Sequence, residues 1–163
     1  MKIAIVSDIH DHTNHLLSAV VTAKELGCER MIFLGDMAHL RSFITLREEW
    51  SRPLDLVFGN NEYEWDEFMR YAETAPDTTL HGEYGELELD GRRIFFCHLP
   101  SDALRASASG RYDVIFYGHT HDARCEYHDG VLLANPGEVQ GRQSVPSIGV
   151  YETRTGQFLH YHI

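Results

Sequence analysis

Hydrophobic residues in the first half of the chain alternate between short unbroken runs and stretches at helical spacing. The apolar runs have the pattern of buried strands, and the spaced stretches have that of helices with one apolar face. Strands are expected at residues 3–6, 31–34 and 54–58, and helices over 16–24, 40–47 and 65–72. Gly27 stands where the first helix would stop. This alternation predicts a parallel sheet with crossover helices.

The second half is rich in expected strands and in hairpin turns. Strands are expected at residues 85–89, 92–97, 112–117, 124–127, 131–134, 147–151 and 158–161. Asp90-Gly91, Asp129-Gly130 and Thr155-Gly156 are turn signals between consecutive strands. A short helix is expected near residues 101–107. We therefore expect a single α/β domain over residues 1–163, with two packed sheets flanked by helices.

Side chains that can bind metal follow five of the expected strands. They are Asp8 and His10, Asp36, Asn60, His98, and His119 with His121. Because ligands of open α/β sheets bind beyond the carboxyl ends of the strands, we expect these seven donors to converge. Where the local chain is extended, Asp8 and His10 project the same way, as do His119 and His121. Nitrogen and oxygen donors without thiolates suit Zn, Mn, Fe, Co or Ni, and argue against a closed structural zinc site.

Charge and cysteine content narrow the classes of function. The 163 residues include 25 Asp and Glu against 14 Lys and Arg, which gives a net charge of −11. Such a charge opposes broad binding to nucleic acid or to an anionic membrane. Three separated cysteines and no apolar run of about 20 residues fit a cytoplasmic protein without disulfides. The 11 histidines have two interpretations, scattered surface residues or metal ligands, and their spacing favours ligands for some of them.

The order of the motifs is more specific than any one of them. D-x-H, G-D, G-N-x-[DE], H and G-H-x-H occur in that order and resemble the calcineurin-like metallophosphoesterase superfamily over essentially the whole chain. Gly59-Asn60-Asn61-Glu62 and Asn135-Pro136-Gly137-Glu138 make the chain most similar to the small bacterial and archaeal phosphodiesterases. That family also includes the retromer scaffold subunit of eukaryotes.

The resemblance implies a fold, a ligand set and a cofactor. The fold is the calcineurin-like one, two packed mixed sheets flanked by helices. Two divalent ions are implied, Mn²⁺ or Ni²⁺ first, with Zn²⁺, Fe²⁺ and Co²⁺ as alternatives. The first ion would be held by Asp8, His10 and His121, and the second by Asn60, His98 and His119, with Asp36 between them. Small homo-oligomers are common in the family.

The chain departs from the wider superfamily at two positions. Many members have His at the position of Asn61, where it is proposed as a general acid. An amide has no accessible pKa, so Asn61 is expected to contact a phosphate oxygen instead. This departure weighs against phosphomonoesters, whose poor leaving groups gain more from protonation. His98 is followed by Leu99-Pro100 rather than by the small family's glycine, which changes the rim of the pocket.

These patterns favour a metal-dependent phosphodiesterase that acts on a small phosphodiester. The mechanism expected from the resemblance is in-line attack by a hydroxide that bridges the two ions. Two alternatives remain open, a protein-binding scaffold on the same fold and a phosphomonoesterase. Trp50 and Trp65 are expected to serve packing rather than substrate binding.

Overall fold

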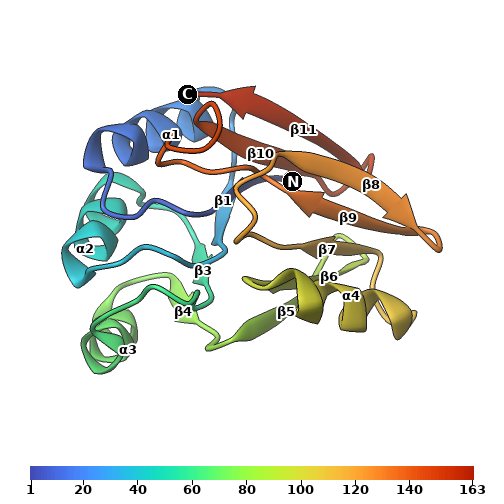
Figure 1. Ribbon diagram of the computed structural model, residues 1–163, viewed down its shortest axis with the longest axis horizontal. Coiled ribbons are helices and arrows are strands. Elements are labelled where there is room, and N and C mark those ends of the chain that lie inside the picture. The colour runs from blue at the N-terminus through green and yellow to red at the C-terminus, as the bar shows by residue number, and fades with distance from the viewer.

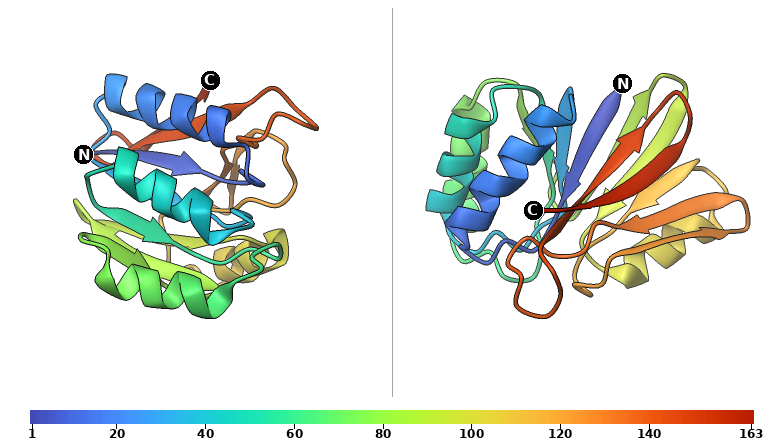
Figure 2. Two further views of the ribbon diagram at one scale, coloured as in Figure 1. Left: turned by 90° about the vertical axis from the view of Figure 1, so that its left-hand side faces the viewer. Right: turned by 90° about the horizontal axis from the view of Figure 1, so that it is seen from above.

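Four layers of secondary structure build the protein, in the order helices, sheet, sheet, helix (Figure 1). The computed structural model describes residues 1–163. The first sheet has the strand order β11-β10-β1-β2-β3-β4 and the second β5-β6-β7-β9-β8. Figure 2 shows α1 to α3 covering the outer face of the first sheet, with α4 against the second. Two mixed sheets flanked by helices confirm the predicted fold class.

The bounds of the elements follow the expected pattern closely. The first sheet comprises β1 (Lys2–Val6), β2 (Arg30–Phe33), β3 (Leu54–Leu56), β4 (Thr78–Leu80), β10 (Ser147–Glu152) and β11 (Gln157–His162). The second comprises β5 (Tyr84–Leu89), β6 (Arg92–Cys97), β7 (Val114–Phe116), β8 (Arg124–His128) and β9 (Val131–Asn135). The helices are α1 (Thr13–Glu25), α2 (Leu40–Glu49), α3 (Trp65–Thr74) and α4 (Pro100–Ala108).

Strand β1 shows how the apolar runs divide between two cores. Ile3 and Ile5 face the second sheet, whereas Ala4 and Val6 face the helices, because successive side chains point to opposite faces. All four are fully buried. A strand buried on both faces needs an unbroken apolar run, which is the signal that the sequence carries.

Two expected hairpins have the backbone that their sequences require. Asp90 and Gly91 have φ of 50° and 74°, and Asp129 and Gly130 have φ of 50° and 83°. Left-handed backbone at both central residues matches a type I′ turn, which suits the twist of the flanking strands. Strand β4 was not predicted from the sequence, because Thr78–Leu80 is a half-buried edge strand without an apolar run.

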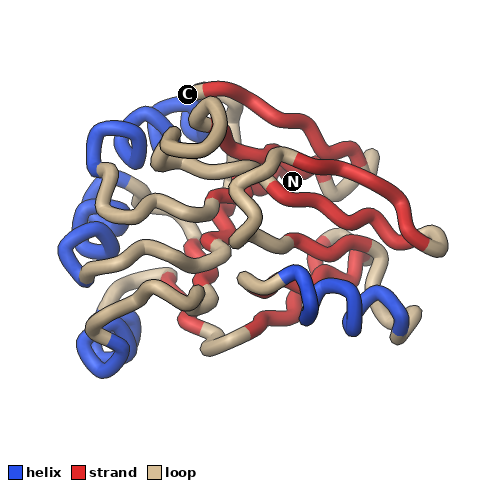
Figure 3. The backbone as a smooth tube through the Cα atoms, in the orientation of Figure 1, coloured by secondary structure: helices blue, strands red, loops and turns tan.

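Strand direction brings distant parts of the chain to one edge of the molecule. β1, β2 and β3 are parallel, and so are β6, β7 and β9. Within each sheet their carboxyl ends therefore lie together, and the loops after β1, β2, β6 and β7 meet between the two sheets (Figure 3). None of the helices is long and apolar enough to cross a membrane.

Asp55 is a buried carboxylate in the middle of β3. It forms an ion pair with Arg30 of the neighbouring strand, and its Oδ1 lies 2.8 Å from Nε2 of His81. Asp55 thus links β2 and β3 to the loop after β4. The apolar pattern of residues 54–58 gave no sign of this ion pair.

We predict that Asp55→Ala lowers the free energy of unfolding by about 3 kcal/mol, because it leaves the Arg30 guanidinium without its partner. Urea denaturation measures the change. Glu67→Ala is the control, since it removes an exposed pair with Arg70 on α3 and should leave the midpoint almost unchanged. Equal effects of the two substitutions would contradict a structural role for Asp55.

Candidate metal centre

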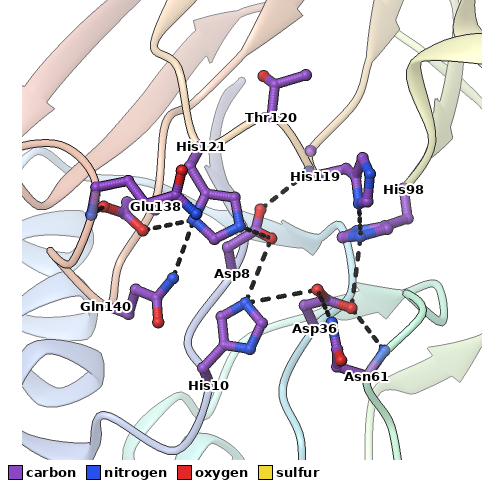
Figure 4. Close-up of polar contacts among 12 residues, drawn as sticks. Asp8, His10, Asp36, Asn61, His98, His119, Thr120, His121, Glu138 and Gln140 are labelled. Carbon is purple, nitrogen blue, oxygen red and sulfur yellow. Dashed lines mark hydrogen bonds and ion pairs between the residues drawn. The ribbon is translucent and has the colours of Figure 1, made fainter.

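Two groups of potential ligands lie side by side at the carboxyl ends of the strands (Figure 4). Asp8, His10 and His121 form the first group, and their donor atoms all lie within 4.8 Å of one another. Asp36, His98 and His119 form the second group within the same limit. The residues come from the loops after β1, β2, β6 and β7, so a continuous site is assembled from segments far apart in the sequence.

Short distances join the two groups. Nε2 of His10 lies 3.7 Å from Oδ1 of Asp8 and 3.5 Å from Oδ2 of Asp36. Oδ1 of Asn60, which follows β3, lies 3.1 Å from Nε2 of His98. The structure thus brings all seven sequence-predicted donors into one place, with Asp36 between the groups.

The backbone at these residues differs from the expectation of extended chain. Asp8 and His10 have φ of 57° and 44°, and His119 and His121 have φ of 69° and 60°. The condition under which each pair would project the same way, an extended chain, is therefore not met at either pair. Asp36, with φ of 61°, is left-handed as well. Strained backbone of this kind costs about 1–3 kcal/mol for each residue and is concentrated at functional sites.

Glycines allow the loops to approach one another closely. A Cβ atom on Gly59 would lie 2.1 Å from Oδ1 and 2.5 Å from the backbone nitrogen of Asp36. A Cβ atom on Gly118 would lie 2.1 Å from Oγ of Ser7. The G-N and G-H motifs thus need glycine because the neighbouring loop leaves no room for a side chain, and not because glycine takes part in the reaction.

Two histidines are oriented by hydrogen bonds from the nitrogen that faces away from the site. Nδ1 of His98 lies 2.8 Å from the carbonyl oxygen of Leu34, and Nδ1 of His121 lies 2.5 Å from Oε2 of Glu138. The Leu34 carbonyl and the Glu138 carboxylate are acceptors, which places the proton of each ring on Nδ1, and the side-chain nitrogen of Gln140 also lies 2.9 Å from Nδ1 of His121. In the neutral rings each Nε2 then presents a lone pair to the site.

Each of these lone pairs faces a carboxylate oxygen, and Nε2 of His98 also lies 3.2 Å from Nδ1 of His119. Nε2 of His98 lies 3.4 Å from Oδ1 of Asp36, and Nε2 of His121 lies 3.3 Å from Oδ1 of Asp8. Oδ1 of Asp8 and Nε2 of His10 are buried and have no hydrogen-bond partner at all. Facing lone pairs repel unless a cation lies between them, so the donor set fits divalent metal ions.

The electrostatics of the site agree with this interpretation. Burial opposes ionisation of Asp36, but His98 and the Asn61 hydrogen bonds outweigh it and hold the Asp36 pKa well below its usual value. Burial would lower the His98 pKa, yet the Asp36 and Asp8 carboxylates raise it overall. The nearby Asp8 carboxylate also raises the pKa of His10. The Asp36 carboxylate thus stays ionised, and the raised histidine pKa values show that the two carboxylates attract positive charge.

Asn61 lies beside Asp36 at the edge of the site. Its backbone N–H donates to Oδ1 of Asp36 at 2.9 Å, and its side-chain amide donates to Oδ2 at 2.7 Å. An amide NH₂ has two hydrogens, so one remains for a further acceptor. Asn61 also lines an open pocket of about 510 Å³ next to His10 and His121.

Three further residues of the site had no role in the sequence interpretation. Arg142 lines that pocket and forms no ion pair, in a chain with a net charge of −11. Buried Glu62 accepts the backbone N–H groups of Met37 and Gly59, and so ties two ligand loops together. Glu138 orients His121. The signal for Glu62 and Glu138 was present, since both end the quoted G-N-N-E and N-P-G-E segments, whereas nothing marked Arg142.

Comparison with known proteins agrees with the geometry. The model of the calcineurin-like phosphoesterase superfamily domain matches residues 1–156. The phosphodiesterase MJ0936 of Methanocaldococcus jannaschii is 30% identical over 161 residues, which cover 97% of this chain and 96% of that protein. A solved archaeal phosphodiesterase is similar with a TM-score of 0.93, 29% identity and full coverage of both chains. Vps29 of Chaetomium thermophilum shares the fold at a TM-score of 0.67 and 18% identity, over all of this chain and 93% of its own.

We predict that Glu138→Gln weakens Mn²⁺ binding about 10- to 100-fold, because the ring of His121 loses its charged partner. Isothermal titration calorimetry on the metal-free protein measures the affinity. Glu126→Gln on the exposed strand β8 is the matched control and should bind like the parent. Unchanged affinity in Glu138→Gln would show that Glu138 does not position a ligand.

Proposed function

The chain belongs to the calcineurin-like phosphoesterase superfamily, and on that premise we propose that it hydrolyses small phosphodiesters at a centre of two divalent metal ions. The observation that carries the proposal is the pair of adjoining donor groups with unpartnered, buried Asp8 and His10 atoms. The 30% identity to a phosphodiesterase over nearly the full chain supports the reaction class.

In this proposal Asp8, His10 and His121 hold one ion, and His98, His119 and Asn60 hold the other. Asp36 lies between the two groups and would bind both ions. We propose Mn²⁺ or Ni²⁺ as the ions, with Zn²⁺, Fe²⁺ and Co²⁺ as alternatives compatible with nitrogen and oxygen donors. Such a pair supplies Lewis acidity, which lowers the pKa of water and offsets charge on phosphate oxygens.

The chain's own residues then bind and orient the phosphate. Arg142 and Asn61 line the same pocket as His10 and His121, so their N–H groups are available to phosphate oxygens. The Arg142 charge counters the repulsion that a chain of −11 would exert on an anion. Hydrolysis places the hydroxyl of water on phosphorus and returns a proton to the departing ester oxygen.

A diester is favoured over a monoester by the absence of a strong acid at Asn61. The amide is held by Asp36 and cannot give up a proton to the leaving oxygen. The scaffold alternative rests on the likeness to Vps29, which at 18% identity concerns the fold. The complete set of seven donors favours the enzyme.

We predict that Asp36→Asn lowers metal-dependent hydrolysis of bis(4-nitrophenyl) phosphate at least about 100-fold, because the shared ligand loses its charge. The assay follows nitrophenolate release with Mn²⁺ or Ni²⁺. Asp129→Asn makes the same change at an exposed turn and should leave the rate unaffected. Full activity of Asp36→Asn would overturn the two-metal proposal, and activity on 4-nitrophenyl phosphate above that on the diester would overturn the diesterase assignment.

We predict that Arg142→Ala raises KM for the same diester about 10-fold, because it removes a charge-assisted hydrogen bond to the phosphate. The change in kcat should be smaller, and Arg142→Lys should recover part of the loss. Arg154→Ala at the β10–β11 turn is the control for net charge. A KM equal to that of the parent would exclude Arg142 from substrate binding.

A further inference from the structure

A second pocket opens beside the other half of the site. Its volume is about 260 Å³, and Asn60 and His98 form part of its wall. It lies between the start of α3 and the start of α4, whereas the Arg142 pocket borders His10 and His121. The two pockets therefore flank the paired donor groups, one beside each group.

Trp65 contributes a large aromatic side chain to the lining of the second pocket. One face of its indole stacks on the buried ring of Phe58, with ring centroids 4.1 Å apart and an interplanar angle of 20°. Its Nε1 donates to the carbonyl oxygen of Glu62 at 3.0 Å, so the ring is held in place. The residue is nevertheless 43% exposed, whereas Trp50 is fully buried. A packing role, as expected from the sequence, accounts for Trp50. It does not account for the exposed part of Trp65.

Leu99 adds a second apolar side chain to the lining of the pocket. Leu99 directly follows His98, precedes α4, and is 38% exposed. A large apolar residue thus projects beside a ligand loop, on the side of the pocket formed by α4.

Polar groups form much of the remaining lining, among them the Asp102–Arg105 ion pair of α4. The side chains of Glu83 and Ser101 line the pocket and form no hydrogen bond or ion pair. A partly exposed indole with free hydrogen-bonding groups nearby suits a planar heterocycle with polar edges better than an alkyl chain. Stacking on aromatic side chains is how proteins bind nucleobases without strict sequence preference.

We propose that this pocket binds the base of a nucleoside esterified to the reacting phosphate, with the base stacked on the free face of Trp65. The substrate class is then a nucleoside phosphodiester. The inference rests on the proposed function, because it places the phosphate at the paired donor groups. Trp65 is a specificity-determining residue in this assignment and takes no part in bond cleavage.

Two substrates that differ only in the base test the proposal. They are the 2,2,2-trifluoroethyl ester of adenosine 5′-phosphate and the same ester of 1-O-methylribose 5-phosphate. Neither carries another aromatic ring, and ¹⁹F NMR follows trifluoroethanol release by the Mn²⁺-loaded protein. We expect kcat/KM for the adenosine ester to exceed that for the abasic ester about 10- to 100-fold. In Trp65→Leu this ratio should fall to about 3 or less, and in the control Tyr127→Leu, an exposed aromatic residue on β8, it should not change.

Fluorescence gives a second measurement that requires neither turnover nor a variant. Adenosine 5′-monophosphate should quench the emission of exposed Trp65 in the parent protein and saturate, whereas ribose 5-phosphate should not. Equal kcat/KM for the two esters in the parent protein, or no quenching, overturns the base pocket. If both esters are still hydrolysed, the proposed phosphodiesterase activity stands. Saturable quenching without hydrolysis of any diester supports the pocket and contradicts the proposed activity.

Discussion

The fold holds carboxylate oxygens and imidazole nitrogens close together, although these groups repel one another unless a cation lies between them. Asp8 and Asp36 are almost fully buried carboxylates, and imidazole lone pairs of His98 and His121 face them at 3.3–3.4 Å. Leu34 and Glu138 fix these rings from behind, so the rings cannot turn to relieve the repulsion. A divalent ion turns this repulsion into attraction, which is why the same geometry that costs stability supports metal binding.

The rest of the fold makes that arrangement possible. Each sheet contains parallel strands that end at the site. Their apolar residues are buried on both faces of the strand, and each strand ends where its apolar run ends. Glycines at the ligand loops allow backbone to pass within van der Waals contact, and Glu62 ties two of the loops by their N–H groups. These loop contacts maintain the left-handed backbone at the site residues, which the residues would not adopt by their own conformational preference.

The sequence was informative where burial and strand ends produce a simple pattern. Continuous apolar runs revealed β1 and β2, and donors placed just after such runs indicated the site. The sequence did not predict the local backbone conformation of the site. The loops at Asp8 and His119 are left-handed, and tertiary contacts rather than local preference maintain them. The ion pair of Asp55 and the exposure of Trp65 were also hidden, because neither changes the apolar pattern along the chain. Arg142 lies in a loop, where periodicity carries no information.

Anomalous diffraction from crystals grown with Mn²⁺ tests the central claim most directly, because it locates metal without reference to activity. The account predicts two manganese peaks in each chain. One should lie among Asp8, His10 and His121 and the other among His98, His119 and Asn60, with Asp36 touching both. No peak among these residues, or manganese bound only at surface carboxylates elsewhere, would contradict the account.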